Sequence, residues 1–174
     1  MSDEQDHSTA AAVAVYVGAM CNPNESVRLR AVRNLGQVEQ GSVRIDAALT
    51  TALHDPSYVV RGTAAMTLGQ GGRDTGLVAP ALIEALKADP HEEVRWRAAE
   101  ALGGLSDTDP PALAALIAAL EDPDEEVRGN AAISLGWCGS TSGSCISALI
   151  AALDDRDEWV RGRAAFALRT LGSR

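Results

Sequence analysis

The sequence contains few aromatic residues and almost no lysine. Phe, Trp and Tyr together make up 3% of its 174 residues, and Lys87 is the only lysine. A core with so few rings has to be built from small aliphatic side chains, which favours thin helices in close contact. The net charge is −9 at pH 7, and phosphate contacts need clustered lysine and arginine, so we expect no nucleic-acid partner.

Long hydrophobic runs are also missing. No segment approaches the ~20 apolar residues that a membrane-spanning helix needs. The first residues lack the basic start and the apolar run of a signal peptide. We therefore expect a cytoplasmic protein that does not associate with a membrane. Residues 1–8 are polar, and we expect them to form a short disordered tail.

Cysteine is scarce as well, because three residues do not make a disulfide framework. Cys21 is expected in the core. Cys138 and Cys145 flank a connector rich in Gly and Ser, and three interpretations of them stay open: buried thiols, a redox-active pair, or part of a metal site. A metal ion would need further ligands, and no histidine lies in that region, so we expect neither a metal nor a cofactor.

What the chain has instead is an internal repeat. Its anchor is a proline that usually follows aspartate, and the copies are spaced by 33 or 34 residues. Pro23, Pro56, Pro90 and Pro123 head four copies, and Arg156 takes the same place in the fifth. A fixed period of this size predicts a solenoid of stacked units.

Each copy predicts a pair of helices. After the anchor, Val, Ala and Leu recur in steps of four, which places them on one helical stripe. The residue before the anchor is a natural N-cap, with proline in the first helical position, and a glycine after the leucine is a C-terminal stop. An apolar segment before each anchor predicts the other helix. The glycines are Gly36, Gly69, Gly103 and Gly136, and Arg169 replaces them in the fifth copy.

One helix pair buries little surface alone, so adjacent pairs must stack to form a continuous core. We therefore predict an all-α fold, an α-solenoid of five stacked helix pairs. The units are expected near residues 9–41, 42–75, 76–108, 109–141 and 142–174, within a single domain that spans residues 9–174.

The pattern Asp-Pro-x-x-x-Val-Arg-x-x-Ala-Ala-x-x-Leu-Gly resembles the HEAT repeat, in particular the short bacterial and archaeal variant known from phycobilisome lyases. The resemblance covers almost the whole chain. It implies a hydrogen-bonded ladder between the Asp and Arg of the units. The residues concerned are Asn22, Asp55, Asp89, Asp122 and Asp155, with Arg28, Arg61, Arg95, Arg128 and Arg161. Asn22 departs from the pattern and predicts a weaker ladder at that end.

The resemblance also implies that the second helices line a concave binding face. With Val, Ala and Leu pointing inward, the outward positions of these helices hold most of the unusual side chains. The candidate partner-binding residues are Trp96, Trp137, Trp159, Phe166, Ile133, Met66, Arg30, Arg97 and Arg163. Two interpretations stay open: the rings bind a partner or fill grooves between units, and the arginines recognise a ligand or pair with acidic neighbours.

We find no catalytic constellation in the sequence. The favoured interpretation is a non-enzymatic scaffold that binds a protein partner on the concave face. The alternative, implied by the resemblance, is a phycobilin lyase or chromophore-handling subunit. The first helix has no charged face from residue 10 to 20, so it is either tolerated by water because its residues are small or covered through self-association or by a partner.

Overall fold

The computed structural model describes residues 2–38, 43–70, 75–105, 110–138 and 142–172, and these segments form helices joined by turns. The first helices of the five pairs are α1 (Ser2–Ala19), α3 (Val43–Ala52), α5 (Thr75–Ala88), α7 (Pro110–Ala119) and α9 (Gly143–Ala151). The second helices are α2 (Glu25–Gln37), α4 (Tyr58–Leu68), α6 (Glu92–Leu105), α8 (Glu125–Trp137) and α10 (Glu158–Gly172). A short 3-10 turn, η1 (Ala152–Asp154), follows α9. The prediction of an all-α solenoid of helix pairs is confirmed.

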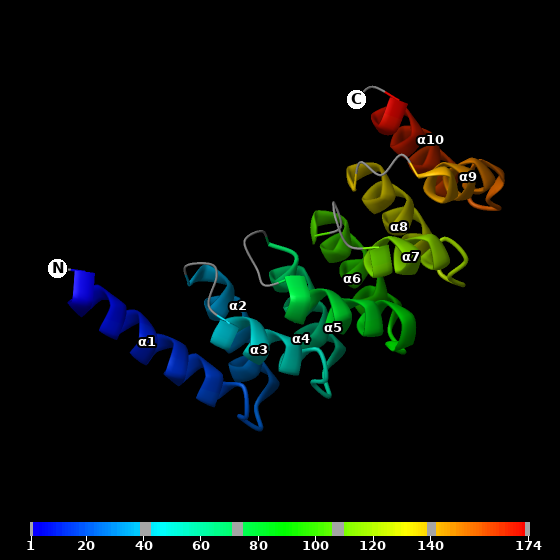
Figure 1. The fold of residues 1–174 in the computed structure, drawn as a ribbon. Helices are drawn as coiled ribbons and strands as arrows, with labels where there is room; N and C mark the ends of the chain where they lie inside the picture. Colours follow the sequence, from blue (N-terminus) through cyan, green and yellow to red (C-terminus); the bar gives the residue numbers. More distant parts are fainter. Residues whose placement is uncertain (1, 39–42, 71–74, 106–109, 139–141, 173–174) are drawn as a thin grey trace.

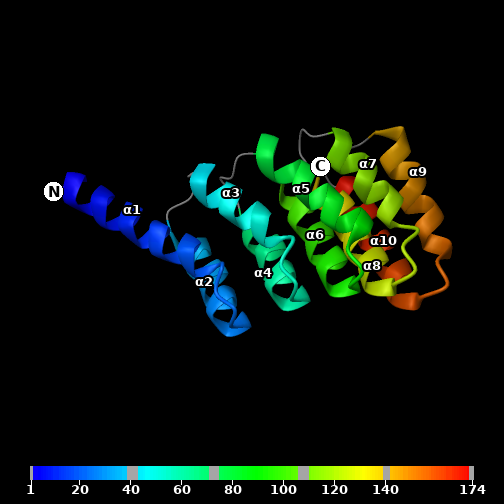
Figure 2. The same cartoon turned by 90° about the horizontal axis from the view of Figure 1, so that it is seen from below.

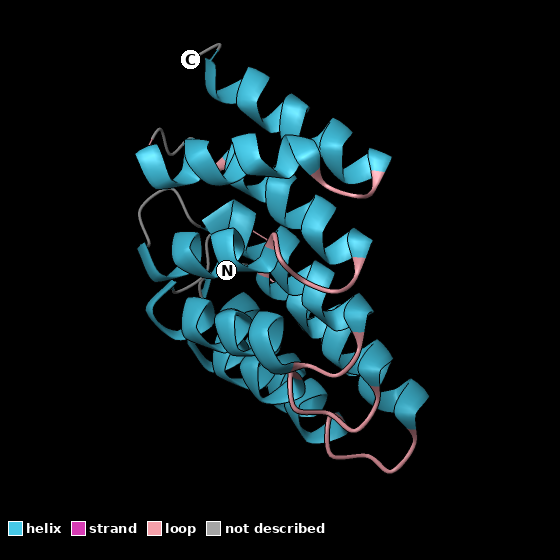
Figure 3. Ribbon diagram, turned by 90° about the vertical axis from the view of Figure 1, so that its right-hand side faces the viewer, coloured by secondary structure: helices cyan, strands magenta, loops and turns pink. Residues whose placement is uncertain are grey.

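The five pairs form a curved row (Figure 1). Each second helix contacts the second helix of the next pair, and α6, α8 and α10 lie on the inner side of the curve. The turns that join the two helices of a pair follow one another along one edge of the stack (Figure 3). The boundaries that we expect between units lie in or beside stretches outside the described residues.

The core is a continuous row of aliphatic side chains at the repeat positions. Leu35, Leu68, Leu102 and Leu135 are fully buried, whereas Leu168 of the fifth pair is only partly buried. The alanine stripe beside them is buried in every unit. Small residues thus let the helices approach, and leucine fills the space between them.

The second helices begin two residues later than we expected. The N-cap of α8 is Asp124, not Asp122, and the Asp124 side chain accepts hydrogen bonds from the amides of Glu126 and Val127. Asp122 instead accepts a hydrogen bond from the Asp124 amide, 2.9 Å away, which closes a turn around the proline. Asp122 and the proline anchor after it therefore lie in the turn before α8, and the Asp122 carboxylate also makes a contact between units, as described below.

The glycine after the repeat leucine ends the helix only in α4, where Gly69 is the C-cap. Gly36, Gly103 and Gly136 lie inside α2, α6 and α8. A Cβ atom at Gly136 would lie 2.8 Å from the Cα atom of Ala167 in α10, and one at Gly69 would lie 2.7 Å from the Cα atom of Ala101 in α6. These glycines therefore permit the close approach of successive second helices.

The first helix begins at Ser2, so residues 2–8, where we expected a disordered tail, belong to α1, while Met1 lies outside the described residues. The sequence from Ser2 to Val17 has neither Pro nor Gly, so nothing in it stops the helix. Val13 is buried, and Tyr16, Val17 and Met20 pack against the core. The N-terminal half of α1 extends past its neighbours (Figures 1 and 2). Its outward face is mostly alanine, with Val15 exposed.

We expect Gly136→Ala to destabilise the fold by about 1–3 kcal/mol, because the added methyl group meets the backbone of α10 and forces α8 and α10 apart. Urea unfolding followed by circular dichroism measures the change. Gly18→Ala is the matched control, since a Cβ atom there meets nothing within 4 Å. It should leave stability unchanged or raise it slightly. Equal effects of the two substitutions would contradict the close-approach role of Gly136.

Candidate interaction surface

The turns along one edge are tied together by a ladder of arginines. Arg128 donates from Nε and NH2 to the two carboxylate oxygens of Asp155 in the next unit, at 2.8 and 3.0 Å. Its NH1 group donates to the carbonyl oxygens of Asp122 and Pro123 in its own unit, at 2.9 and 3.1 Å. Each such guanidinium therefore joins two successive turns. The other pairs are Arg28–Asp55, Arg61–Asp89 and Arg95–Asp122.

The implied ladder is confirmed, with each arginine bound to the aspartate of the following unit. Asn22 belongs to the first turn, and no described arginine precedes it to need a carboxylate there. Its side chain still accepts a hydrogen bond from the Asn24 amide at 2.9 Å, so the turn forms normally. At the other end, Arg161 donates only to the carbonyl oxygens of Asp155 and Arg156 among the described residues.

Electrostatics favour the charged form of these pairs. The hydrogen bonds from Arg128 hold the pKa of Asp155 below its usual value, although burial acts in the opposite direction. The two side chains are only 5% and 11% exposed. Partly buried, bidentate pairs of this kind are stronger than exposed ion pairs. The four ladder arginines that hold a carboxylate are thus structural and not available to a ligand.

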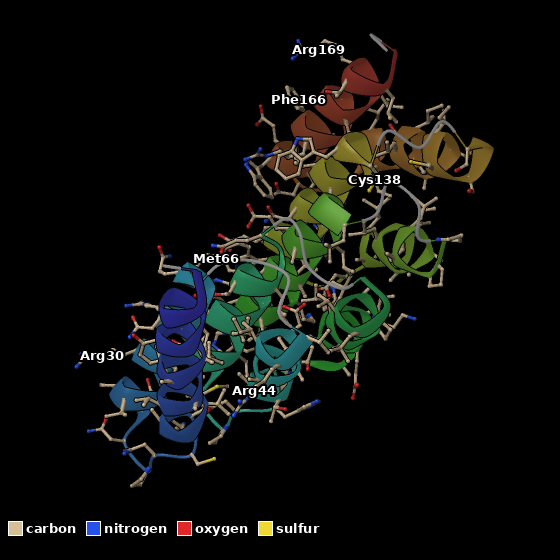
Figure 4. The ribbon with its side chains drawn as sticks, turned by 60° about the vertical axis from the view of Figure 1, so that its left-hand side comes forward. Arg30, Arg44, Met66, Cys138, Phe166 and Arg169 are labelled. Carbon is tan, nitrogen blue, oxygen red and sulfur yellow. The ribbon has the colours of Figure 1, made fainter. Side chains whose placement is uncertain are left out.

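The outward positions of the second helices expose several large apolar side chains. Met66 is 47% exposed, Trp137 46%, Trp159 40% and Phe166 43%. Arg30, Met66 and Phe166 lie along the same side of the stack (Figure 4). Trp96 is partly buried and packs against the core. The structure therefore brings the predicted residues Arg30, Met66 and Phe166 to one side, and Trp159 and Arg163 line the same hollow as Phe166.

Ile133 does not belong to this surface. It was expected to point outward from α8, but it is 5% exposed. α8 lies between α6 and α10 and contacts both of them. A short branched side chain stays within that space, whereas Met66 and Phe166 at the same repeat position reach solvent.

Trp159 fills a groove and also remains exposed. Its ring lies on Gly129 of α8, where a Cβ atom would be 1.8 Å from the ring atom Cζ3. The guanidinium of Arg163 lies 4.7 Å from the centre of the same ring. The two interpretations of this residue are therefore not exclusive. In the sequence, this groove is indicated by Gly129, the glycine that follows the ladder arginine Arg128.

The predicted arginines behave differently from one another. Arg97 donates to Glu93 at 2.6 Å and lies 5.2 Å from the centre of the Trp96 ring, so its pairing with an acidic neighbour is confirmed. Its side chain also covers Gly62 of α4. Arg163 stacks on a ring instead. Arg30 is exposed and makes no hydrogen bond or ion pair with the part of the chain that the structure describes.

The three cysteines differ in their exposure to solvent. Cys138 and Cys145 are buried, and burial raises the pKa of the Cys145 thiol, with Cys138 nearby adding to the effect. A raised pKa makes a thiol less reactive at neutral pH. Cys21 is exposed, not in the core as expected, because α1 ends at Ala19. Within the described ranges no group of three or more His, Cys, Asp and Glu is placed to hold a metal ion. The described helices include none that is long and apolar enough to cross a membrane.

Stacked helix pairs, closely packed second helices and the arginine–aspartate ladder together define an α-solenoid. Residues 79–169, more than half of the chain, match the family model for HEAT repeats. The chain therefore belongs to the HEAT-repeat family. No curated protein sequence matches it at a significant level.

Several solved structures share this fold. The complex of CpcE and CpcF of phycocyanin lyase from Nostoc is 25% identical, with a TM-score of 0.76, over 93% of this chain and 65% of that chain. This chain thus spans slightly less than two thirds of that one. An engineered protein is 24% identical, with a TM-score of 0.62, over 92% of this chain and 79% of its own. A designed armadillo repeat protein in complex with the peptide (KR)4 is 20% identical, with a TM-score of 0.63, over 96% of this chain and 84% of that chain.

We expect Asp155→Asn to destabilise the fold by about 1.5–3 kcal/mol, because Arg128 keeps its charge but loses its bidentate carboxylate. Asparagine supports the turn itself, as Asn22 does. Arg161→Gln is the matched control at a ladder position without a carboxylate partner among the described residues, and it should cost less stability than Asp155→Asn because it removes only hydrogen bonds to the carbonyl oxygens of Asp155 and Arg156. Chemical denaturation of both variants tests this. A larger loss for Arg161→Gln than for Asp155→Asn would contradict the ladder assignment.

Proposed function

We propose that the protein is a non-enzymatic scaffold that binds a protein partner on the concave face formed by its second helices. The supporting observation is the set of large apolar side chains exposed on these helices: Met66, Trp137, Trp159 and Phe166. The repeat positions of each unit already serve the core and the ladder. The outward positions are the ones free to specify a partner, and exposed apolar groups beside arginine are typical of interaction sites.

The face is mixed in character. Arg30 is an exposed charge at the N-terminal end of the row, and Met66 lies further along it. Arg163 covers part of an aromatic ring near the C-terminal end. An extended partner that follows the curve would meet apolar contacts separated by charges. This arrangement favours specific recognition of one segment over general adhesion.

The test is capture of partners by an immobilised concave-face variant that carries Met66→Glu and Trp137→Glu. The matched control carries Val43→Glu and Ile150→Glu, which are exposed on the first helices α3 and α9. We expect the concave variant to lose a partner that the wild type and the control both retain. Circular dichroism establishes that all three are folded. A partner lost equally from both variants, or retained by both, would contradict binding at the concave face.

A second candidate is a chromophore-handling role, and the likeness to the phycocyanin lyase complex supports it. Exposed rings such as Trp159 and Phe166 are suited to stack on a tetrapyrrole. If this role is correct, phycocyanobilin binds stoichiometrically and its absorption spectrum shifts on titration with the protein. A spectrum unchanged beyond that seen with an equal concentration of serum albumin would exclude this role.

A further inference from the structure

We propose a second interaction surface at the C-terminal end of the stack, which shares Trp159 with the proposed concave face and adds Arg161 and Gly162 to it. It consists of Arg161, Gly162 and the edge of Trp159 on α10. We infer that it binds a protein segment in which an aspartate is followed four residues later by an aromatic residue at the start of a helix. The counterparts of Arg161 and Gly162 in earlier units show what these two positions hold when a following unit is present.

Arg161 is the first part. Its four counterparts each hold a carboxylate of the following unit through two hydrogen bonds from Nε and NH2, between 2.6 and 3.0 Å long. Arg161 uses NH1 in the same way as they do, on the carbonyl oxygens of its own turn. Its Nε and NH2 groups have no carboxylate partner in the described ranges. The guanidinium is thus held in position to receive one.

Gly162 is the second part. Its counterpart Gly129 lies under the Trp159 ring, and Gly62 lies under the Arg97 side chain, so both carry a large side chain of the following unit. A Cβ atom at Gly162 would meet nothing within 4 Å. Gly162 faces an open hollow that is also lined by Asp157, Glu158, Trp159, Arg163 and Phe166. A large side chain of a partner can occupy it as Trp159 occupies the notch over Gly129.

The spacing of the partner motif follows from the segment Asp155–Trp159. Asp155 binds Arg128, and Trp159, four residues later, covers Gly129. The two receiving residues are adjacent in α8, as Arg161 and Gly162 are in α10. The hollow itself carries two carboxylates, Asp157 and Glu158, and one guanidinium, Arg163, so the attraction for a partner aspartate comes from Arg161.

A second copy of this chain does not fit this surface. Its first turn carries Asn22, which offers an amide in place of a carboxylate, and its ladder aspartates already bind arginines. Arg169 also stands where the earlier units have the close-approach glycine, so a further unit of the same kind cannot pack as tightly. The surface is therefore suited to a heterologous segment with a free aspartate.

The test uses an acetylated and amidated peptide of residues 155–162, Asp-Arg-Asp-Glu-Trp-Val-Arg-Gly, titrated into the labelled full chain. Nuclear magnetic resonance follows the Arg161 side-chain Nε–H and the Gly162 amide, with the Arg128 Nε–H as an internal control because its carboxylate site is occupied. We expect saturable shifts at Arg161 and Gly162. A peptide with Asn and Ala in place of its first Asp and its Trp should bind about tenfold more weakly or not at all.

Two variants of the protein make the test specific. Arg161→Gln should weaken peptide binding about tenfold or more, and Gly162→Leu should block the notch while the fold stays intact, because the added side chain meets open space. Met66→Glu on the concave face should leave binding unchanged, which separates this surface from the proposed scaffold function. Shifts confined to residues around Met66 and Trp96, equal binding by all variants, or no saturation would each overturn the proposal.

Discussion

The structure depends on an arginine that serves two turns at once. In each internal unit the guanidinium completes its own turn through carbonyl oxygens and fixes the next turn through a carboxylate. A turn is therefore fully hydrogen-bonded only when its neighbour is in register. Because the contact joins the same positions of successive units, an insertion within one unit would displace every later pair. This requirement explains why the period stays at 33 or 34 residues while the residues between the anchors vary.

Curvature follows from a difference between the two layers of helices. Successive second helices touch through glycine, with Gly69 against Ala101 and Gly136 against Ala167, so their axes come close together. The first helices have no such series of glycines and contact one another less extensively. A stack that is tighter in one layer bends toward it, which places α6, α8 and α10 on the inner side (Figure 1). The concave face is thus a geometric result of the repeat.

The helix pairs, their order and their approximate bounds were predictable from the sequence, because Val, Ala and Leu in steps of four lie on one face of a helix. The N-caps were not, because Asp122 and Asp124 are both good capping residues and spacing alone does not choose between them. The ladder takes Asp122, which leaves Asp124 to cap α8. For the glycines, the repeat position alone did not reveal the close contacts, because Ala101 and Ala167 lie in other helices.

The surface was harder to predict than the fold, because exposure depends on neighbours in other units. Ile133 and Phe166 share a repeat position, yet one is buried and the other is exposed. Trp159 is explained only by Gly129, which lies in another helix. In a repeat protein, however, the same position can be compared between units, because each internal unit shows what that position contacts when a neighbouring unit is present.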